Sequence, residues 1–248
     1  DDTILVSIMH VNNETGSIQP IEEIKNIIKE KNPNTLFHVD GVQGFGKIDI
    51  SLKASGIDSY SFSGHKIHGP KGIGGLFIDK KHVISPIVFG GNQERGLRSG
   101  TENVTGIIGF GEAVKIMSEK YKEERQYVFE LKEYFGNRIR EEIDDIRINT
   151  SLDENSSPYI LNISFRNVRG EVLLHYLEDK DIYVSTTSAC SSKGTEKSHV
   201  LESMGLKDEE IEGAIRFCFS YENTKKDLDY TVEVLKESVT EIRQIIMR

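Results

Sequence analysis

The stretch of this chain that decides the fold is SFSGHK, residues 61–66, which places Lys66 directly after a short β-like segment. A lysine amine at the end of a strand can form an imine with a carbonyl compound, which is how proteins hold aldehyde cofactors. The alternative is a solvated lysine beside a polar turn, because most lysine side chains are surface charges. The six residues alone do not choose between these interpretations.

A second polar motif lies upstream, in FHVDGVQ, residues 37–43. Asp40 ends a short apolar run, and the carboxyl ends of parallel strands deliver such residues to a ligand crevice. The carboxylate of Asp40 is suited to pair with the protonated pyridine nitrogen of pyridoxal phosphate (PLP), and Gln43 is close enough in sequence to reach the ring hydroxyl. A turn or helix-cap role is the alternative for Asp40, since it precedes a glycine.

Further motifs surround these two. They are MHVNNETG (9–16), GPKG (69–72), GGNQERGLRSGTEN (90–103), SACSS (188–192) and IRF (215–217). With these segments, almost from end to end, the chain resembles the class V aminotransferase group of fold-type I PLP enzymes, and within it the cysteine desulfurases of the NifS/IscS type. Several motifs in the correct order and spacing are far more specific than any one of them.

Hydrophobic periodicity predicts alternating strands and helices. The expected strands are 4–9, 35–39, 59–63, 72–78, 159–165, 182–185 and 214–219, and the expected helices are 20–31, 104–143, 170–178, 198–204 and 224–247. This order favours an α/β fold with a mainly parallel sheet, followed by a compact α+β unit. We expect no internal repeat.

The resemblance implies PLP-dependent transferase fold type I. Residues 1–120 would be the C-terminal part of the PLP-binding large domain, and residues 121–248 a small C-terminal domain, with the boundary near Lys120. The chain begins with DDTILVSI and lacks an initiator methionine, whereas members of the family carry a further N-terminal part with a phosphate-binding loop and a ring-stacking histidine. We therefore expect a truncated chain that binds PLP weakly or not at all and has impaired activity.

The composition is that of a soluble intracellular enzyme. The 40 acidic and 31 basic residues give a formal charge of −9, which makes nucleic acid a poor partner. No apolar run approaches the ~20 residues of a membrane span, and no signal sequence opens the chain. Only two cysteines occur, which predicts a reducing, cytoplasmic location. The histidines lack metal-ligand spacing, so no metal site is expected.

The two cysteines differ in their surroundings. Cys190 lies among serines and threonines beside Lys193, a setting typical of an exposed loop. Cys218 lies between two phenylalanines, and we expect it to be a small buried hydrophobe on a strand. On chemistry alone Cys190 is either a reactive thiol or a structural one. The family resemblance implies that it forms a persulfide.

The resemblance also implies a reaction. L-Cysteine would displace Lys66 from PLP, the ring would act as an electron sink, and Lys66 would carry the Cα proton. The thiolate of Cys190 would then attack the substrate sulfur, giving L-alanine and a Cys190 persulfide. Asn13 and Arg216 match residues that bind the substrate carboxylate, a task that suits a guanidinium fork. A structural role is the alternative for both.

Other expectations follow from the same resemblance. Ser63 and His65 match residues that donate hydrogen bonds to the cofactor phosphate. Thr101 matches a residue that relatives contribute from the neighbouring subunit, which implies a homodimer. A sulfur-acceptor protein, such as an iron–sulfur scaffold, is the expected partner, although the sequence does not name the acceptor.

Three alternatives remain open. A class V aminotransferase or a selenocysteine lyase would keep Lys66 and Asp40, but a plain aminotransferase has no need of a thiol on a polar loop. Release of alanine and sulfide from cysteine, rather than a keto acid, separates these activities. The third alternative is a fragment that carries the motifs without activity.

Overall fold

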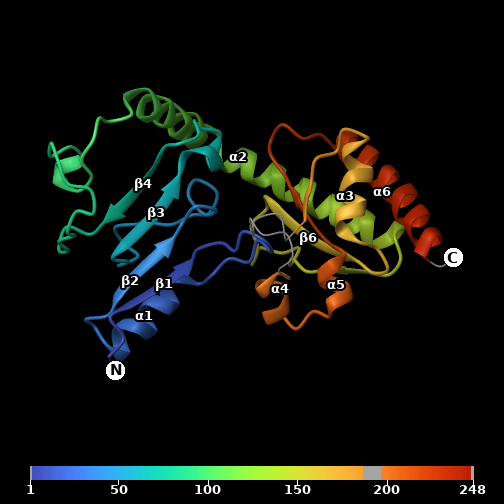
Figure 1. Ribbon diagram of the computed structural model, residues 1–248, viewed down its shortest axis with the longest axis horizontal. Coiled ribbons are helices and arrows are strands. Elements are labelled where there is room, and N and C mark those ends of the chain that lie inside the picture. Colours follow the sequence, from blue (N-terminus) through green and yellow to red (C-terminus); the bar gives the residue numbers. More distant parts are fainter. Residues whose placement is uncertain (1, 187–196, 247–248) are drawn as a thin grey trace. The chain divides into compact units, whose positions relative to one another are not determined.

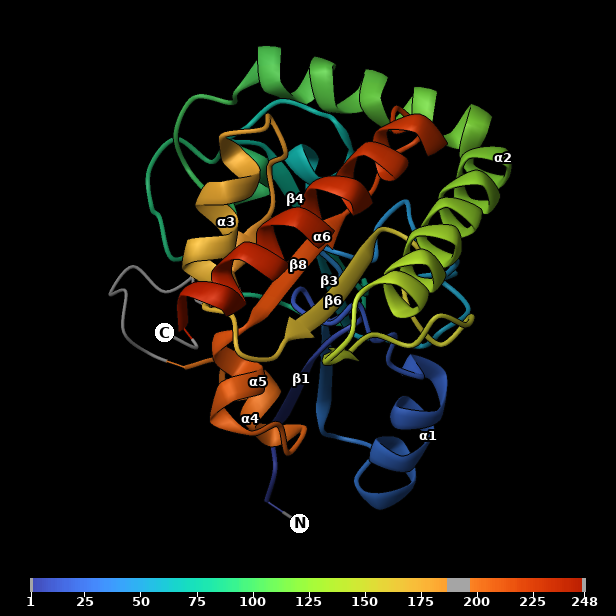
Figure 2. The ribbon, with the colours of Figure 1, turned by 90° about the vertical axis from the view of Figure 1, so that its right-hand side faces the viewer.

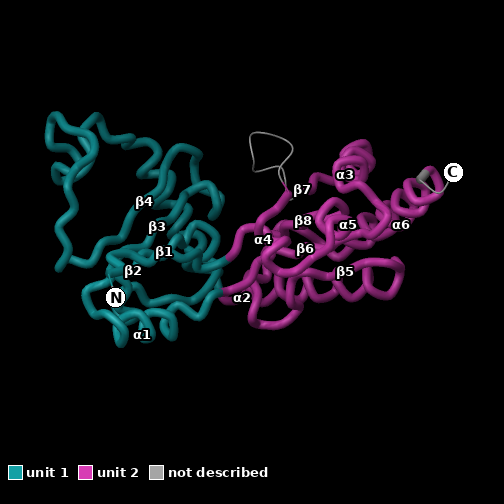
Figure 3. The backbone as a smooth tube through the Cα atoms, turned by 60° about the horizontal axis from the view of Figure 1, so that its bottom comes forward, with its two compact units in different colours: residues 1–11, 19–121 teal, residues 12–18, 122–248 magenta. Residues whose placement is uncertain are grey.

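The chain forms two compact units, which Figure 3 distinguishes by colour. The computed structural model describes residues 2–186 and 197–246. Unit 1 comprises residues 1–11 and 19–121, and unit 2 comprises residues 12–18 and 122–248. The expected domain boundary near Lys120 stays a prediction.

Unit 1 is built on a four-stranded sheet in the order β1-β2-β3-β4. The strands β1 (Leu5–Met9), β2 (Leu36–Asp40) and β3 (Ser59–Ser63) are parallel, and β4 (Gly74–Ile78) runs antiparallel to β3. The mainly parallel sheet predicted for the first part of the chain is therefore confirmed.

Strand β2 anchors the core of unit 1. Its side chains Phe37 and Val39 are fully buried and pack in one cluster with Ile21 of helix α1 (Ile21–Lys31). Figure 1 shows α1 beside β1 and β2. The helix begins directly after Pro20, which is consistent with the preference for proline at helix starts.

Unit 2 contains an antiparallel sheet in the order β5-β6-β8-β7. Its strands are β5 (Ile146–Ile148), β6 (Ile160–Phe165), β8 (Ala214–Cys218) and β7 (Ser185–Thr186). The antiparallel sheet with its helices is the α+β unit predicted for this part of the chain. The short strand β5 was not predicted, because three residues are too few for a periodic signal.

One face of this sheet forms the core of unit 2. Leu161, Ile163 and Ile215 are fully buried against α2 (Val104–Glu142), α3 (Gly170–Glu178) and α6 (Lys225–Ile246). Figure 2 shows α3 and α6 side by side across the strands. The long helix predicted over 104–143 is thus present as α2. None of the helices in the described part of the chain is both long and apolar enough to cross a membrane.

The opposite face of the same sheet carries polar side chains. Asn162 on β6 is the register partner of Arg216 on β8, which is in turn the partner of Ser185 on β7. Directly opposed residues of antiparallel strands point to the same face, so these three form a polar row. The short helices α4 (His199–Ser203) and α5 (Asp208–Glu212) pack with the first residue of β8 on this side.

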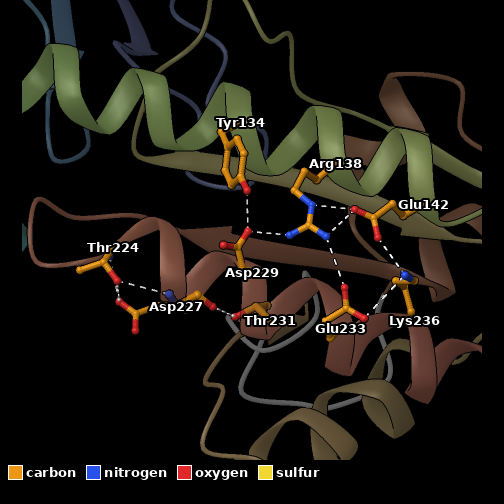
Figure 4. Close-up of polar contacts among 9 residues, drawn as sticks. All are labelled: Tyr134, Arg138, Glu142, Thr224, Asp227, Asp229, Thr231, Glu233 and Lys236. Atoms are coloured by element: carbon orange, nitrogen blue, oxygen red, sulfur yellow. Dashed lines mark hydrogen bonds and ion pairs between the residues drawn. The ribbon is translucent and has the colours of Figure 1, made fainter.

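Ion pairs connect α2 and α6 (Figure 4). Arg138 of α2 lies 2.6 Å from Asp229 and 3.3 Å from Glu233, both on α6. In the reverse direction, Lys236 of α6 lies 2.8 Å from Glu142 of α2. Because Asp229 and Glu233 are about half exposed, each of their pairs contributes roughly 0.2–1 kcal/mol. Apolar burial on the sheet therefore holds these helices more than the ion pairs do.

Candidate active site

Lys66 lies immediately beyond the carboxyl end of β3. It belongs to a single 3₁₀ turn, Gly64–Ile67, in which its side chain is half-buried. The turn is tight because Gly64 packs closely: a Cβ atom there would lie 2.9 Å from Ile73 and 3.1 Å from Phe110. A side chain at this position would push Ile73 and Phe110 away, so glycine lets the turn that carries Lys66 pack closely at the end of the strand.

Asp40 ends the neighbouring strand β2. Its register partner on β3 is Ser61, so the carboxylate and the SFSGHK stretch lie at the same edge of the parallel sheet. Asp40 Oδ1 accepts a hydrogen bond from the Val42 amide at 3.0 Å, which closes an Asx turn. The structure thus brings Asp40 and the Lys66 turn to the carboxyl ends of adjacent strands, the usual ligand edge of such sheets.

A buried pair supports the turn that follows Asp40. The Tyr60 hydroxyl lies 3.1 Å from His10 Nδ1, and both side chains are nearly inaccessible. Burial lowers the pKa of His10, which favours the neutral form of the ring. Burial and the nearby charge of Asp40 raise the pKa of Tyr60, which keeps its proton. Gly41 lies against the Tyr60 ring, since a Cβ there would come within 1.8 Å of it.

The sequence analysis missed this His10–Tyr60 pair. The two residues are 50 positions apart, and although His10 belongs to the MHVNNETG motif, the motif does not point to Tyr60 as its partner. Gln43 is half-buried within the turn that the pair supports. The available signal was His10 itself, a histidine that directly follows the expected strand 4–9.

The expected phosphate donors contact each other. Ser63 Oγ lies 2.7 Å from His65 Nδ1, and this pair is exposed. Thr101 is also exposed, in the segment between β4 and α2. The structure therefore leaves the hydroxyl and imidazole at the surface of unit 1 near Lys66. Their binding roles, and that of Thr101, stay predictions.

In unit 2, Arg216 and Asn13 are in contact. Arg216 Nη1 donates to the backbone carbonyl of Asn13 at 3.0 Å. The next residue, Glu14, is buried and accepts a hydrogen bond from Ser198 Oγ at 2.5 Å. Arg216 Nε is buried and has no partner among the residues that the structure describes. A buried N–H of a cation without an acceptor is costly, and a carboxylate ligand would satisfy it.

The structure tests the expectation for only one of the two cysteines. Cys190 lies outside the described residues. Cys218 was expected to be buried, and this expectation is wrong, because its side chain is exposed. Side chains alternate along a strand, so Phe217 and Phe219 enter the core while Cys218 points to the other face. Because both neighbours of Cys218 face the core, Cys218 itself must face away from it.

Comparison with known proteins places these features in a family. The profile of the family described as aminotransferase class V matches residues 1–231. The chain belongs to the class V aminotransferase family. Within this family it is similar to a cysteine desulfurase IscS from Buchnera aphidicola subsp. Baizongia pistaciae, with 46% identity over 98% of this chain and 59% of the relative.

Other family members are similar to the same extent. A cysteine desulfurase IscS from Dictyoglomus turgidum is 43% identical over 98% of this chain and 61% of its own length. A solved structure of a NifS-like protein superposes with a TM-score of 0.89 and 42% identity, covering 97% of this chain and 62% of that one. The chain thus spans about three fifths of the length of the relatives it matches, and its fold is that of NifS-like fold-type I enzymes.

Proposed function

We propose that the protein containing this chain is a PLP-dependent cysteine desulfurase, which converts L-cysteine to L-alanine and holds the sulfur as a persulfide on Cys190. The observation that carries the proposal is the position of Asp40 and the Lys66 turn at the carboxyl ends of adjacent parallel strands. Membership of the class V family and the names of the IscS relatives support it.

The donor set fits PLP. The site offers one amine for the aldehyde at Lys66, one carboxylate for the pyridine nitrogen at Asp40, and the adjacent Ser63 and His65 side chains for the phosphate. Gln43 supplies an amide for the ring hydroxyl. When bound, PLP would provide an electron sink that stabilises negative charge at the substrate Cα.

The side chains of unit 1 then have distinct tasks. The Lys66 amine would hold the cofactor, and the same amine would move a proton between the substrate Cα and the methyl-forming carbon. Asp40 favours the cationic form of the ring through its negative charge. The Asx turn to Val42 holds this carboxylate in place.

The groups of unit 2 bind the substrate and accept its sulfur. Arg216 and Asn13 bind the α-carboxylate of L-cysteine, and the unpartnered Arg216 Nε supports this role. The Cys190 thiolate attacks the substrate sulfur; the carbon–sulfur bond breaks and a sulfur–sulfur bond forms. Thiol plus L-cysteine gives persulfide plus L-alanine, so atoms and electrons balance without an external oxidant.

We further propose an oligomeric state, a partner and a cellular location. Thr101 acts in the site of a second copy, so the protein is a homodimer, and a sulfur-acceptor protein such as an iron–sulfur scaffold removes the persulfide sulfur. The low cysteine count supports a cytoplasmic location.

The deciding experiment exposes the intact protein to L-cysteine. Alanine should appear in the solution, and mass spectrometry of the peptide with Cys190 should show one added sulfur. A keto acid in place of alanine would instead identify an aminotransferase. A selenocysteine lyase would release alanine from selenocysteine but leave L-cysteine unchanged.

A further inference from the structure

Consecutive backbone carbonyls in segment 12–18 accept hydrogen bonds from side chains of the unit 2 sheet. Arg216 Nη1 donates to the Asn13 carbonyl at 3.0 Å. Asn162 Nδ2 donates to the next carbonyl, that of Glu14, at 3.3 Å. Arg216 and Asn162 are register partners on β8 and β6, so one polar row of the sheet holds two successive peptide groups.

Thr150 completes the series. Its hydroxyl donates to the Thr15 carbonyl at 2.7 Å and accepts a hydrogen bond from the backbone N–H of Asn162 at 2.8 Å. Thr150 is 3% exposed and Asn162 is fully buried. Because neither side chain reaches solvent, neither is in a position to meet a ligand that enters from solution.

The orientation of the Asn162 amide is fixed by a second asparagine. Asn149 Nδ2 donates to Asn162 Oδ1 at 2.7 Å. Because Asn162 Oδ1 faces Asn149, the Nδ2 group at the other end of the same side-chain amide faces the Glu14 carbonyl. Removing a partner from a buried polar group destabilises the fold. The network therefore stabilises one arrangement of segment 12–18.

Segment 12–18 in turn restricts the orientation of the Arg216 guanidinium group. The Asn13 carbonyl takes one guanidinium nitrogen, Nη1, while Nε stays buried without a partner in the described part of the chain. A displaced Asn13 carbonyl would let the guanidinium rotate, and its two parallel donors would no longer match a carboxylate. The hydrogen bonds of Thr150 and Asn162 therefore act on the direction of the Arg216 fork.

We propose that Thr150 and Asn162 are positioning residues for the binding of an α-carboxylate by Arg216. The inference rests on the proposed function, which makes the ligand an α-amino acid. Their contribution is made through the carbonyls of Glu14 and Thr15 and requires no contact with the ligand.

The test measures the affinity of the intact protein for L-alanine and for L-alaninamide, whose carboxylate is replaced by a neutral amide, by calorimetry. Wild type should prefer L-alanine by about tenfold or more, the ratio that a charge-assisted hydrogen bond supplies. Thr150→Val, which keeps the shape and removes the hydroxyl, should lose most of this preference, and Thr150→Ser should restore it. Thr240→Val is the control for the same substitution away from this network, because the Thr240 hydroxyl also donates to a backbone carbonyl at 2.7 Å, but at an exposed position on α6.

The result that overturns the inference is a Thr150→Val protein that keeps the wild-type preference, or one that loses affinity for both ligands equally, as general loosening would predict. Failure of the proposed function has a different signature. If the preference changes as expected but no sulfur moves from L-cysteine to Cys190, the positioning role stands and the desulfurase assignment falls.

Discussion

The carboxylate of Asp58, which is almost fully buried, lies 2.8 Å from the ammonium of Lys29 on α1. The same carboxylate accepts hydrogen bonds from the Phe37 amide at 2.8 Å and from His82 at 2.6 Å, and lies 2.9 Å from the Lys81 ammonium. Burial alone raises the pKa of Asp58, but the bonds from Lys29, Lys81 and His82 outweigh it and hold the pKa well below its usual range. One side chain thus connects α1, β2 and the turn after β4.

Replacing Asp58 by asparagine should lower the free energy of unfolding by about 2–4 kcal/mol at pH 7, because a neutral amide leaves the ammonium groups of Lys29 and Lys81 without their buried counter-charge. The folded pKa is depressed, so this stability is fully present above the unfolded pKa of about 4 and is lost as pH falls below it. The difference in unfolding free energy between wild type and Asp58→Asn, measured by urea unfolding, should therefore become smaller in acid. Asp79→Asn is the control, since this exposed carboxylate also meets Lys81 and should change stability by less than about 0.5 kcal/mol. Equal losses in the two variants would contradict the prediction.

Lys132 is a fully buried amine in unit 2. It donates to Ser156 Oγ at 2.5 Å and to the Ser157 carbonyl at 3.1 Å. Burial lowers its pKa from the usual 10.5 to about 8, although the charge of Asp153 opposes the shift. Between these two values the unfolded chain binds more protons than the folded one, so this group adds stability as pH rises.

Lys132→Met removes that titration. The stability of wild type relative to the variant should increase by about 1–3 kcal/mol between pH 7.5 and pH 10. Urea unfolding at both pH values measures the difference, and Lys115→Met, at an exposed position on α2, is the control. A difference that stays constant with pH would show that Lys132 keeps an ordinary pKa.

The sequence predicted the elements that show periodicity, and missed contacts between distant residues. The apolar positions of 35–39 and the long charged pattern of 104–143 correctly indicated β2 and α2, which the structure has at Leu36–Asp40 and Val104–Glu142. Asp40 and Lys66 were found because strand ends and their chemistry are local features. The Thr150–Thr15 bond joins residues 135 positions apart, and although Thr15 belongs to the MHVNNETG motif, no local pattern marks Thr150 as its partner. The misplacement of Cys218 came from treating aromatic neighbours as a sign of burial, when alternation along β8 requires the opposite.

Gly41→Ala should disturb the turn that carries Asp40. The new methyl group would lie 1.8 Å from the Tyr60 ring, so the turn or the ring must move, at a cost of about 1–3 kcal/mol in stability. PLP affinity of the intact protein, followed by its visible absorbance, should fall as well. Gly111→Ala is the control, because nothing lies within 4 Å of a Cβ there and alanine favours the helix. Unchanged PLP affinity in Gly41→Ala would separate Asp40 from cofactor binding.

Lys66 should carry the cofactor. Borohydride reduction of the intact, PLP-loaded protein, followed by peptide mapping, should place the pyridoxyl group on Lys66, and Lys66→Ala should abolish labelling. Lys71→Ala, five positions away in an exposed turn, should keep it. A label on Lys71 or Lys80 would overturn the assignment.

The two cysteines give the last prediction. Cys190→Ser should abolish sulfur transfer while leaving PLP binding intact, because the nucleophile is lost and the cofactor ligands are not. Cys218 is exposed, so Cys218→Ser should change the free energy of unfolding by less than about 0.5 kcal/mol, and persulfide formation should proceed at the wild-type rate. Alanine release from L-cysteine, with mass spectrometry of both cysteine peptides, checks the pair. If Cys218 carries the added sulfur, or if Cys190→Ser releases alanine at the wild-type rate, then the thiol chemistry lies elsewhere and a class V enzyme without a catalytic cysteine becomes the better description.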